Sequence, residues 1–313
     1  MALRLAEAPR APALAASLES SLAALQVARP LAPRQREQLL QWRAEIDARP
    51  AVRREALRTL HHFACTGGTL IAKCIAAMPN VQLLSEVDPL SRYLADGAPR
   101  FVPTDMVALL RQSSRGSDPA LVIELFQAQM RVLQGHATRR GWALVLRDHA
   151  HSHFCEGADV AERPNLRQLM PAERPLLSLL TVRHPLDSLA SLAAADWLHF
   201  EPRSVDEYCR RYHRFLDSHA GVPVLRYEDF VASPRPSMQR ICGILQLGFQ
   251  PRFAELFSGF GLSGDSGRSG DRIVSRPSQP RAVALEDEAG RSETYLSLVA
   301  RLGYGLRAGQ LES

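Results

Sequence analysis

The sequence contains almost no lysine. Lys73 is the only lysine among its 38 lysine and arginine residues, and the residue before it is an alanine. The common phosphate-binding signature G-x-x-x-x-G-K-[ST] needs a Gly-Lys pair to hold the phosphates of ATP or GTP. The chain has no such pair, so an ordinary P-loop kinase or nucleotide hydrolase is disfavoured.

Cysteines are few and show no pairing pattern, and long apolar runs are missing. No two cysteines form a C-x-x-C pair, and the odd set is scattered as Cys65, Cys74, Cys155, Cys209 and Cys242. Such usage fits a reducing compartment. No apolar run approaches the roughly 20 residues of a transmembrane helix. Charged residues interrupt the Ala-rich N-terminus, which argues against a signal peptide. We expect a cytoplasmic protein without a membrane span.

The length of 313 residues allows one large domain with an appendage. Apolar residues at helical spacing run from Pro33 to about Leu60. Residues 1–55 are therefore expected to form an N-terminal helical extension, a candidate for contacts in an oligomer, and residues 56–313 the main domain. The net charge of +5 suits an anionic ligand. The basic residues are spread along the chain, so no nucleic-acid surface is expected.

One segment, Leu60 to Lys73, organises the rest of the chain. It begins like a short buried strand, passes through Thr-Gly-Gly-Thr and continues as a helical pattern to about Met78. Glycines let the backbone turn tightly, and the free N–H groups of a helix N-terminus attract anions. Lys73 lies about one turn into the helix, and its side chain would lean back toward the anion. The alternative is a plain strand–helix turn in which the glycines only allow close packing.

Further strands and helices alternate along the chain, which predicts an α/β fold with a parallel sheet. The expected strands are 81–85, 142–146, 176–182 and 222–227, and the expected helices are 119–138, 183–191, 204–219, 237–247 and 295–302. Residues 88–118 look irregular. The Gly-, Ser- and Arg-rich residues 259–280 form either a linker or a lid over an anionic ligand.

Polar residues follow the expected strands where ligands of open α/β sheets bind. Glu86 follows one strand and is placed to face the same crevice as Gly67 and Gly68. The alternating His149, His151 and His153 suggest a metal site at first sight, since neutral imidazoles bind zinc. No cysteine or carboxylate cluster supports that site. A polar loop, or a histidine in acid–base work, is the preferred interpretation, and no metal is expected.

Arg183 follows the strand 176–182, and Ser191 lies on the helix after it. A guanidinium fork with a nearby hydroxyl makes a reasonable phosphate grip. The alternative is that Asp187 caps the helix while Arg183 pairs locally.

Together these motifs resemble the PAPS-dependent sulfotransferases, whose donor is 3′-phosphoadenosine 5′-phosphosulfate (PAPS). The likeness spans roughly residues 60–275 and rests on four motifs in the family's order. The first, Cys65-Thr66-Gly67-Gly68-Thr69-Leu70, is similar to the 5′-phosphosulfate loop, although a cysteine replaces its basic residue. The others are Arg183 with Asp187 and Ser191, similar to the 3′-phosphate motif; Tyr227-Glu228-Asp229 before Ser233-Pro234; and the late turn Arg268-Ser269-Gly270.

The resemblance implies a P-loop-type three-layer α/β/α fold with a mainly parallel sheet. It implies PAPS as sulfonyl donor without a metal, and an acceptor hydroxyl or amine on a small metabolite or glycan. Arg183 and Ser191 would hold the 3′-phosphate, while Arg268 and Gly270 would close on the nucleotide. The aromatic residue usual beside that turn is missing. The alternative function is a catalytically degenerate member that binds a nucleotide or partner without turnover.

The resemblance also suggests two candidates for the base. Tyrosylprotein sulfotransferases carry a catalytic Glu at a position that aligns with Glu86. Cytosolic sulfotransferases carry a His in a Lys-Thr-His sequence, which is similar to Arg147-Asp148-His149. Glu86 is slightly favoured. Because Cys65 replaces the family's cation, Lys73 or one of His61 and His62 is expected to supply the missing charge.

Overall fold

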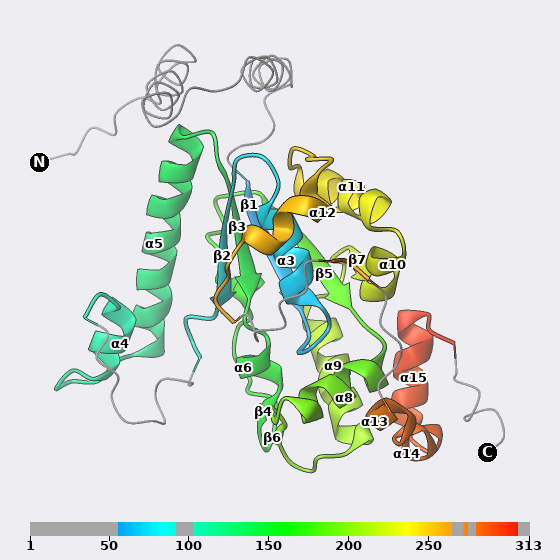
Figure 1. The fold of residues 1–313 in the computed structure, drawn as a ribbon. Coiled ribbons are helices and arrows are strands. Elements are labelled where there is room, and N and C mark those ends of the chain that lie inside the picture. Colours follow the sequence, from blue (N-terminus) through cyan, green and yellow to red (C-terminus); the bar gives the residue numbers. More distant parts are fainter. Residues whose placement is uncertain (1–55, 92–102, 265–271, 275–279, 306–313) are drawn as a thin grey trace, which may run out of the picture.

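The computed structural model describes residues 56–91, 103–264, 272–274 and 280–305. The expected N-terminal extension and the Arg268–Gly270 turn lie outside these ranges. A five-stranded sheet forms the centre, and every strand pair in it is parallel (Figure 1). The expected α/β class with a parallel sheet is therefore confirmed.

The sheet has the strand order β2-β3-β1-β5-β7, with β1 in the middle. Parallel strands covered on both faces are usually rich in apolar residues, as β5 is here, whereas β1 and β2 also carry polar side chains. The strands are β1 (Leu57–His62), β2 (Val81–Val87), β3 (Ala143–Asp148), β5 (Leu176–Val182) and β7 (Val224–Arg226).

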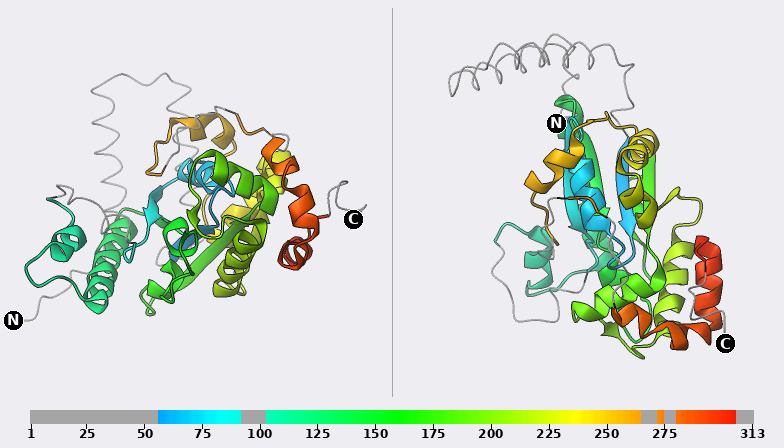
Figure 2. Two further views of the ribbon diagram at one scale, coloured as in Figure 1. Left: turned by 90° about the horizontal axis from the view of Figure 1, so that it is seen from below. Right: turned by 45° about the vertical axis from the view of Figure 1, so that its right-hand side comes forward.

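Helices cover both faces of the sheet, which makes three layers (Figure 2). One face packs against α3 (Gly68–Ala76), α11 (Pro234–Leu245) and α12 (Phe253–Leu256). The other packs against α5 (Pro119–Arg139) and α9 (Val205–Ser218). Successive strand residues point to opposite faces. On β3, accordingly, Leu144 and Leu146 pack with α5, whereas Val145 packs with α3.

Shorter elements gather around the carboxyl ends of the strands and along the edges of the layers (Figure 1). A second, two-stranded sheet pairs β4 with β6 in parallel. These elements are α4 (Met106–Arg111), α6 (His151–Phe154), β4 (Glu156–Gly157), α7 (Leu166–Leu169), α8 (Pro185–Ala194), β6 (His199–Phe200), α10 (Tyr227–Ala232), η1 (Phe257–Gly259), α13 (Pro280–Val283), α14 (Glu286–Gly290) and α15 (Glu293–Leu302).

Several expectations differ from the structure. β2 extends to Val87, so Glu86 lies within the strand that it was expected to follow, and the strand expected at 222–227 ends at Arg226, because Tyr227 opens α10.

The helical pattern expected to reach Leu60 is wrong at its end, because Leu57 to Leu60 belong to β1 and pair with β3 and β5. The stretch 88–118 is not irregular throughout. It contains α4, whose N-cap Asp105 accepts hydrogen bonds from the N–H groups of Val107 and Ala108.

Among the described residues, no helix combines the length and the apolar character that crossing a membrane requires.

Candidate active site

The turn between β1 and α3, residues 65–70, forms a concave loop of backbone N–H groups, named the cradle below. Cys65 and Gly67 both adopt left-handed backbone conformations, with φ of 60° and 83°. Such turns bring successive N–H groups to one concave side. The N–H of Ile71 is bonded to the carbonyl of Gly67 at 3.3 Å and so begins the α-helical hydrogen bonds. The N–H groups of the preceding residues 68–70 therefore have no partner within the helix and point toward the cradle, where the helix dipole is positive.

Gly67 is required by its neighbour as well as by its backbone angle. A Cβ at this position would lie 2.1 Å from Cδ2 of Tyr227, the first residue of α10. The tyrosine ring therefore packs directly on the cradle. The guanidinium carbon of Arg183 lies 5.1 Å from the centre of the same ring, within the range of a cation–π contact. Tyr227 thus holds both the cradle and the arginine.

Arg183 and Ser191 lie together beside the cradle. The Nη1 of Arg183 donates to Ser191 Oγ at 3.2 Å and to the carbonyl of Cys65 at 3.3 Å. Its backbone N–H donates to the Tyr212 hydroxyl at 3.2 Å. The N-cap of α8 is His184, so Asp187 is not the cap residue that the alternative interpretation required. The guanidinium donors of Arg183 thus lie next to the buried hydroxyl of Ser191.

Glu86 owes its direction to an irregularity in β2. The register of β2 against β3 shifts between Leu84 and Val87, and Glu86 has a φ of 60°. Bulges of this kind re-aim a side chain, and a left-handed non-glycine residue stores strain. Glu86 Oε1 is 2.7 Å from Nη1 of Arg147, and Oε2 is 3.4 Å from Nε2 of His149. The two candidate bases are therefore neighbours.

The surroundings shift the pKa values of Glu86 and His149 in opposite directions. Burial raises the pKa of Glu86 to about 7, against the opposing effect of Arg147. Burial lowers the pKa of His149, which makes the neutral imidazole the main form at neutral pH. Near pH 7, Glu86 is close to half protonated. This is the range in which a carboxylate serves well as a general base.

Arg147 is a second cation in contact with the cradle, besides Arg183, and its place there was not expected. Its side chain is buried. It donates to Thr69 Oγ1 at 2.9 Å and to Ser85 Oγ at 2.8 Å, in addition to its contact with Glu86. The alternation of strand faces places Arg147 on the same face of β3 as Val145, which packs with α3, but only the fold shows that this face meets Thr69 and Ser85.

The expected substitutes for the missing cation need correction. Arg147 Nε donates to His62 Nε2 at 2.9 Å, and burial together with Arg147 lowers the pKa of His62 to about 3. His62 is therefore neutral and does not supply the charge. His61 points to the opposite face of β1 and bonds Asp148. Lys73 lies in the last turn of α3, and its proposed role stays a prediction.

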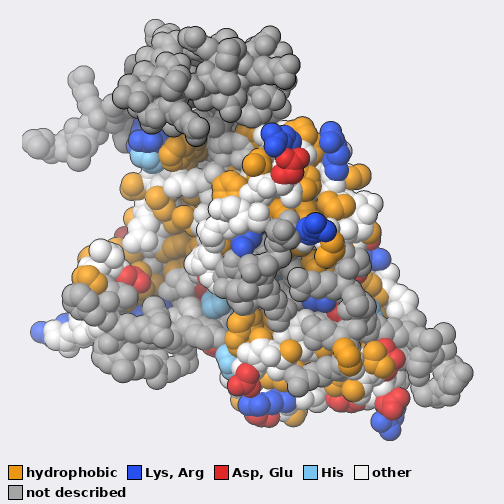
Figure 3. Space-filling view, in the orientation of Figure 1, with side chains coloured by type: hydrophobic (Ala, Val, Ile, Leu, Met, Phe, Trp, Pro, Cys, Tyr) orange, Lys and Arg blue, Asp and Glu red, His pale blue; other side chains and the backbone are white. Residues whose placement is uncertain are grey.

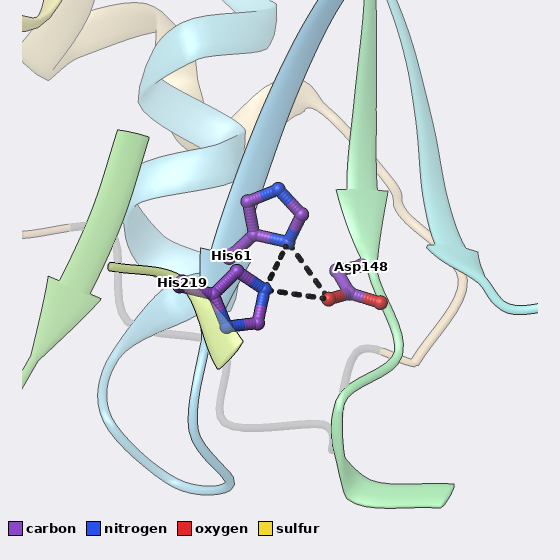
Figure 4. A group of neighbouring side chains, drawn as sticks. All are labelled: His61, Asp148 and His219. Carbon is purple, nitrogen blue, oxygen red and sulfur yellow. Dashed lines mark hydrogen bonds and ion pairs between the residues drawn. The ribbon is translucent and has the colours of Figure 1, made fainter. Parts of the chain in front are cut away.

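A buried network of His61, Asp148 and His219 lies at the end of β3 (Figure 4). His61 Nδ1 is 2.8 Å from Asp148 Oδ2 and 3.2 Å from His219 Nε2. His219 Nδ1 lies 2.8 Å from the carbonyl of Phe215, which can only accept, so Nδ1 carries the proton and Nε2 accepts. Burial raises the pKa of Asp148, the hydrogen bond from His61 lowers it, and the net shift is downward. The contact with His61 holds the Asp148 side chain in place, and with it the end of β3, where Arg147 and His149 are the neighbouring residues.

The described part of the late Gly- and Ser-rich segment covers Glu86. Ser263 Oγ donates to the carbonyl of Ser85 at 2.7 Å, and Ser85 Oγ donates to the carbonyl of Ser263 at 2.9 Å. Gly264 has a φ of 68°, and a Cβ there would lie 2.2 Å from Glu86 Oε1. The backbone of this segment thus packs on the carboxyl group. Arg268 and Gly270 remain predictions, because they lie outside the described residues.

The three alternating histidines do not share one site. His149 faces Glu86. His153 Nε2 donates to the carbonyl of Ala161 at 3.0 Å, and His151 Nε2 lies 3.2 Å from His199 Nδ1. Two groups of metal-ligand type do occur within the described ranges. They are the buried His61, Asp148 and His219, and the more exposed His151, Glu156 and His199.

No protein-family model matches the sequence, and no curated protein does. Similar solved structures exist. The sulfotransferase domain from the curacin biosynthetic pathway is 14% identical, with a TM-score of 0.49 over 80% of this chain and 99% of that domain. The sulfotransferase domain from the Synechococcus PCC 7002 olefin synthase is 13% identical, with a TM-score of 0.48 over 82% of this chain and 98% of that domain.

Mouse sulfotransferase SULT7A1, complexed with PAP, is 11% identical, with a TM-score of 0.39 over 80% of this chain and 90% of that one. At these identities and scores the similarity concerns the course of the chain only. The function is inferred below from the residues of the site.

Proposed function

We propose that this protein is a sulfotransferase that moves the sulfonyl group of PAPS to an acceptor hydroxyl or amine. The observation that carries the proposal is the contact of Arg183 with both Ser191 Oγ and the carbonyl of Cys65, at 3.2 and 3.3 Å. It joins two anion-binding elements that follow the neighbouring strands β1 and β5. A ligand with a 5′-phosphosulfate and a 3′-phosphate presents two anionic groups suited to such a pair.

The site lies where α/β sheets bind nucleotides. The helix after β1 covers one face of the sheet, and the helices after β5 pack on the other. Such a switch point opens a crevice at the carboxyl ends of the two strands. The cradle of residues 65–70 would take the phosphosulfate there, and Arg183 with Ser191 would take the 3′-phosphate.

Three features of the chain would lower the barrier to transfer. Glu86, beside His149, takes the proton of the acceptor as the acceptor's oxygen or nitrogen attacks sulfur. The bond from sulfur to the bridging oxygen breaks, and negative charge grows on the departing nucleotide. The N–H groups of the cradle stabilise this charge, and so does Arg147, which contacts the cradle through Thr69. Preorganised donors of this kind are usually the largest catalytic contribution.

The acceptor is expected to be a small molecule or a glycan. Residues 88–118 follow Glu86 in the sequence and residues 150–172 follow His149, and we expect them to shape its pocket. The described parts are held together at Asp88, which accepts from both Nη atoms of Arg163 at 2.9 and 2.6 Å. This ion pair joins the end of β2 to the segment after α6.

A second candidate function is a nucleotide-binding protein without turnover. The feature that favours it is Cys65 in place of a cation. The contact between Arg147 and Thr69 weakens this argument, because a cation reaches the cradle by another route.

Two measurements on the full-length protein separate these functions. Thermal shift with 3′,5′-bisphosphoadenosine (PAP), compared with ATP, reports nucleotide binding. Acceptor-free hydrolysis of PAPS to PAP and sulfate reports turnover. Stabilisation by PAP together with hydrolysis supports the sulfotransferase. Stabilisation without hydrolysis supports the binding protein, and the absence of both contradicts the proposed donor.

A further inference from the structure

We propose that His151, Glu156 and His199 form a binding site for a transition-metal dication of the Zn²⁺ class. Each side chain offers one ligand atom, and these atoms lie within 4.8 Å of one another. Two imidazoles and one carboxylate are a ligand set found in zinc sites that keep a further position open. This site does not depend on the proposed sulfonyl transfer, because it lies outside the cradle and the Arg183–Ser191 pair.

The two histidines already have the spacing of ligands to one ion. His151 Nε2 and His199 Nδ1 are 3.2 Å apart, and the rings are nearly perpendicular, at 82°. With zinc–nitrogen bonds of about 2.0–2.1 Å, two nitrogens of a tetrahedral site lie about 3.3 Å apart. These nitrogens share a hydrogen bond, and an ion that replaced the shared proton would find their spacing already close to that of two zinc ligands, with rotation of the rings aiming both lone pairs at it.

The backbone places Glu156 next to this pair. Glu156 and His199 are register partners in the parallel pairing of β4 with β6. Side chains of register partners lie on the same face of a sheet with neighbouring Cβ atoms. His151 comes from a third element, since it opens α6. Three elements thus converge, and the carboxylate needs only side-chain rotation to complete the set.

A buried arginine keeps this region in place. Arg211 donates to the carbonyl of Glu156 at 3.1 Å and to that of Gly157 at 2.8 Å. Its guanidinium carbon also lies 4.8 Å from the ring centre of Phe200, the residue after His199. Arg211 is fully buried and paired with Glu207 at 2.5 Å. One guanidinium therefore supports both short strands, which is the support that a preorganised metal site requires.

Access from solvent also suits a metal. His199 is exposed, and histidine side chains reach the surface in the region of α6 (Figure 3). An ion can enter from solvent, and water can complete its coordination.

The buried group of His61, Asp148 and His219 is the weaker candidate. Its contacts are explained by one shared proton, because the Nδ1–H of His61 can serve both Asp148 and the accepting Nε2 of His219. All three side chains are buried. The exposed group is therefore the better metal site.

Calorimetric titration of Zn²⁺ into the reduced, metal-free, full-length protein tests the assignment. We expect one equivalent to bind, with an affinity that falls at least about tenfold in His199→Ala, because even indirect support of a metal ligand is worth about 10- to 100-fold. Glu156→Gln, which keeps the size of the side chain, should weaken binding as well. His136→Ala is the matched control, since His136 is an exposed histidine on α5 and should leave binding unchanged.

Three outcomes would overturn the proposal. They are no binding of Zn²⁺ by the wild type, equal binding by His199→Ala, or binding that is lost in His219→Ala but kept in His199→Ala. The last would move the ion to the buried group. Thermal melting of each variant confirms that it is folded, and the Co²⁺ complex gives an independent readout, because its visible absorption reports nitrogen and oxygen ligands.

Discussion

Two opposing effects set the pKa of Glu86 at the end of β2. Burial favours its protonated form, while Arg147 at 2.7 Å favours the carboxylate. The net result is a pKa of about 7, far above the value of 4.5 for a free glutamate. A carboxyl group with this pKa changes charge in the physiological range, and strongly shifted groups of this kind gather at functional sites.

The rate of acceptor-free PAPS hydrolysis should therefore depend on pH through Glu86. Only the deprotonated form accepts a proton, so the rate should fall about tenfold per pH unit below about 7 and level off above it. Glu86→Gln should lower the rate by about 10²- to 10⁴-fold and abolish this profile, while PAP still binds. A variant that kept both the rate and the pH profile would exclude Glu86 as the base and leave His149.

The same shift affects stability, with a definite sign. The folded protein favours protonated Glu86, so this stabilisation is complete below pH 4.5 and is lost as the pH rises through about 7. Glu86→Gln should remove this part of the pH dependence of unfolding, which denaturant melts at several pH values would measure.

Arg147 is expected to act as the catalytic cation. Arg147→Gln removes the charge beside the cradle and should lower hydrolysis by about 10²- to 10³-fold, the usual cost of losing one preorganised donor. Lys73→Ala tests the other candidate cation under the same conditions, and if Arg147 supplies the charge this variant should keep most of the activity. Initial rates at saturating PAPS give the comparison. The reverse ranking would return the role to Lys73, as first expected from the sequence.

At the scale of the element, the cradle depends on the close contact between Gly67 and the ring of Tyr227, the first residue of α10. Gly67→Ala should weaken PAP binding at least about tenfold, because the added Cβ would overlap the Tyr227 ring and strain a left-handed backbone. Gly243→Ala on α11 is the matched control. A Cβ there meets no atom within 4 Å, so this variant should bind PAP normally and gain about 0.5–1 kcal/mol of stability.

Equal PAP affinity in the two glycine variants, measured by calorimetry, would show that the cradle does not bind the nucleotide.

Elements with continuous local patterns were predictable from the sequence. The strand Leu176–Val182 has the expected bounds, because a strand buried on both faces is one apolar run. Arg183 and Ser191 could be paired in advance, because their spacing matches the 3′-phosphate motif of the family that the sequence resembles, and the two side chains are in contact in the structure. The bulge at Glu86 could not be predicted, since it depends on the register between β2 and β3.

The missed residues act through contacts distant in sequence. Arg147 reaches Ser85 and Thr69 across 62 and 78 positions, and Tyr227 packs on Gly67 from another part of the chain. No local pattern carries such information. His62 was misjudged for a related reason, because only the fold shows that it is buried and accepts a hydrogen bond from a guanidinium.

At the scale of the whole molecule, the sheet brings together two halves of one site. The cradle follows β1, Glu86 lies at the end of β2, and Arg183 follows β5, on the other side of β1. The candidate base and the cradle therefore share one part of the sheet, and Arg183 with Ser191 lies across the switch point. The central claim is that both halves hold one nucleotide.

Calorimetric titration of the full-length protein with PAP and with 5′-AMP, repeated on Arg183→Ala, tests this claim most directly. We expect the wild type to bind PAP at micromolar concentration and 5′-AMP, which lacks the 3′-phosphate, more weakly. Arg183→Ala should lose about 10- to 100-fold in PAP affinity, the effect of a hydrogen bond to a charged group, and little in 5′-AMP affinity. Arg252→Ala, an exposed arginine paired with Glu255, should behave as the wild type. Failure of the wild type to bind PAP, or equal PAP affinity in Arg183→Ala, would contradict the account.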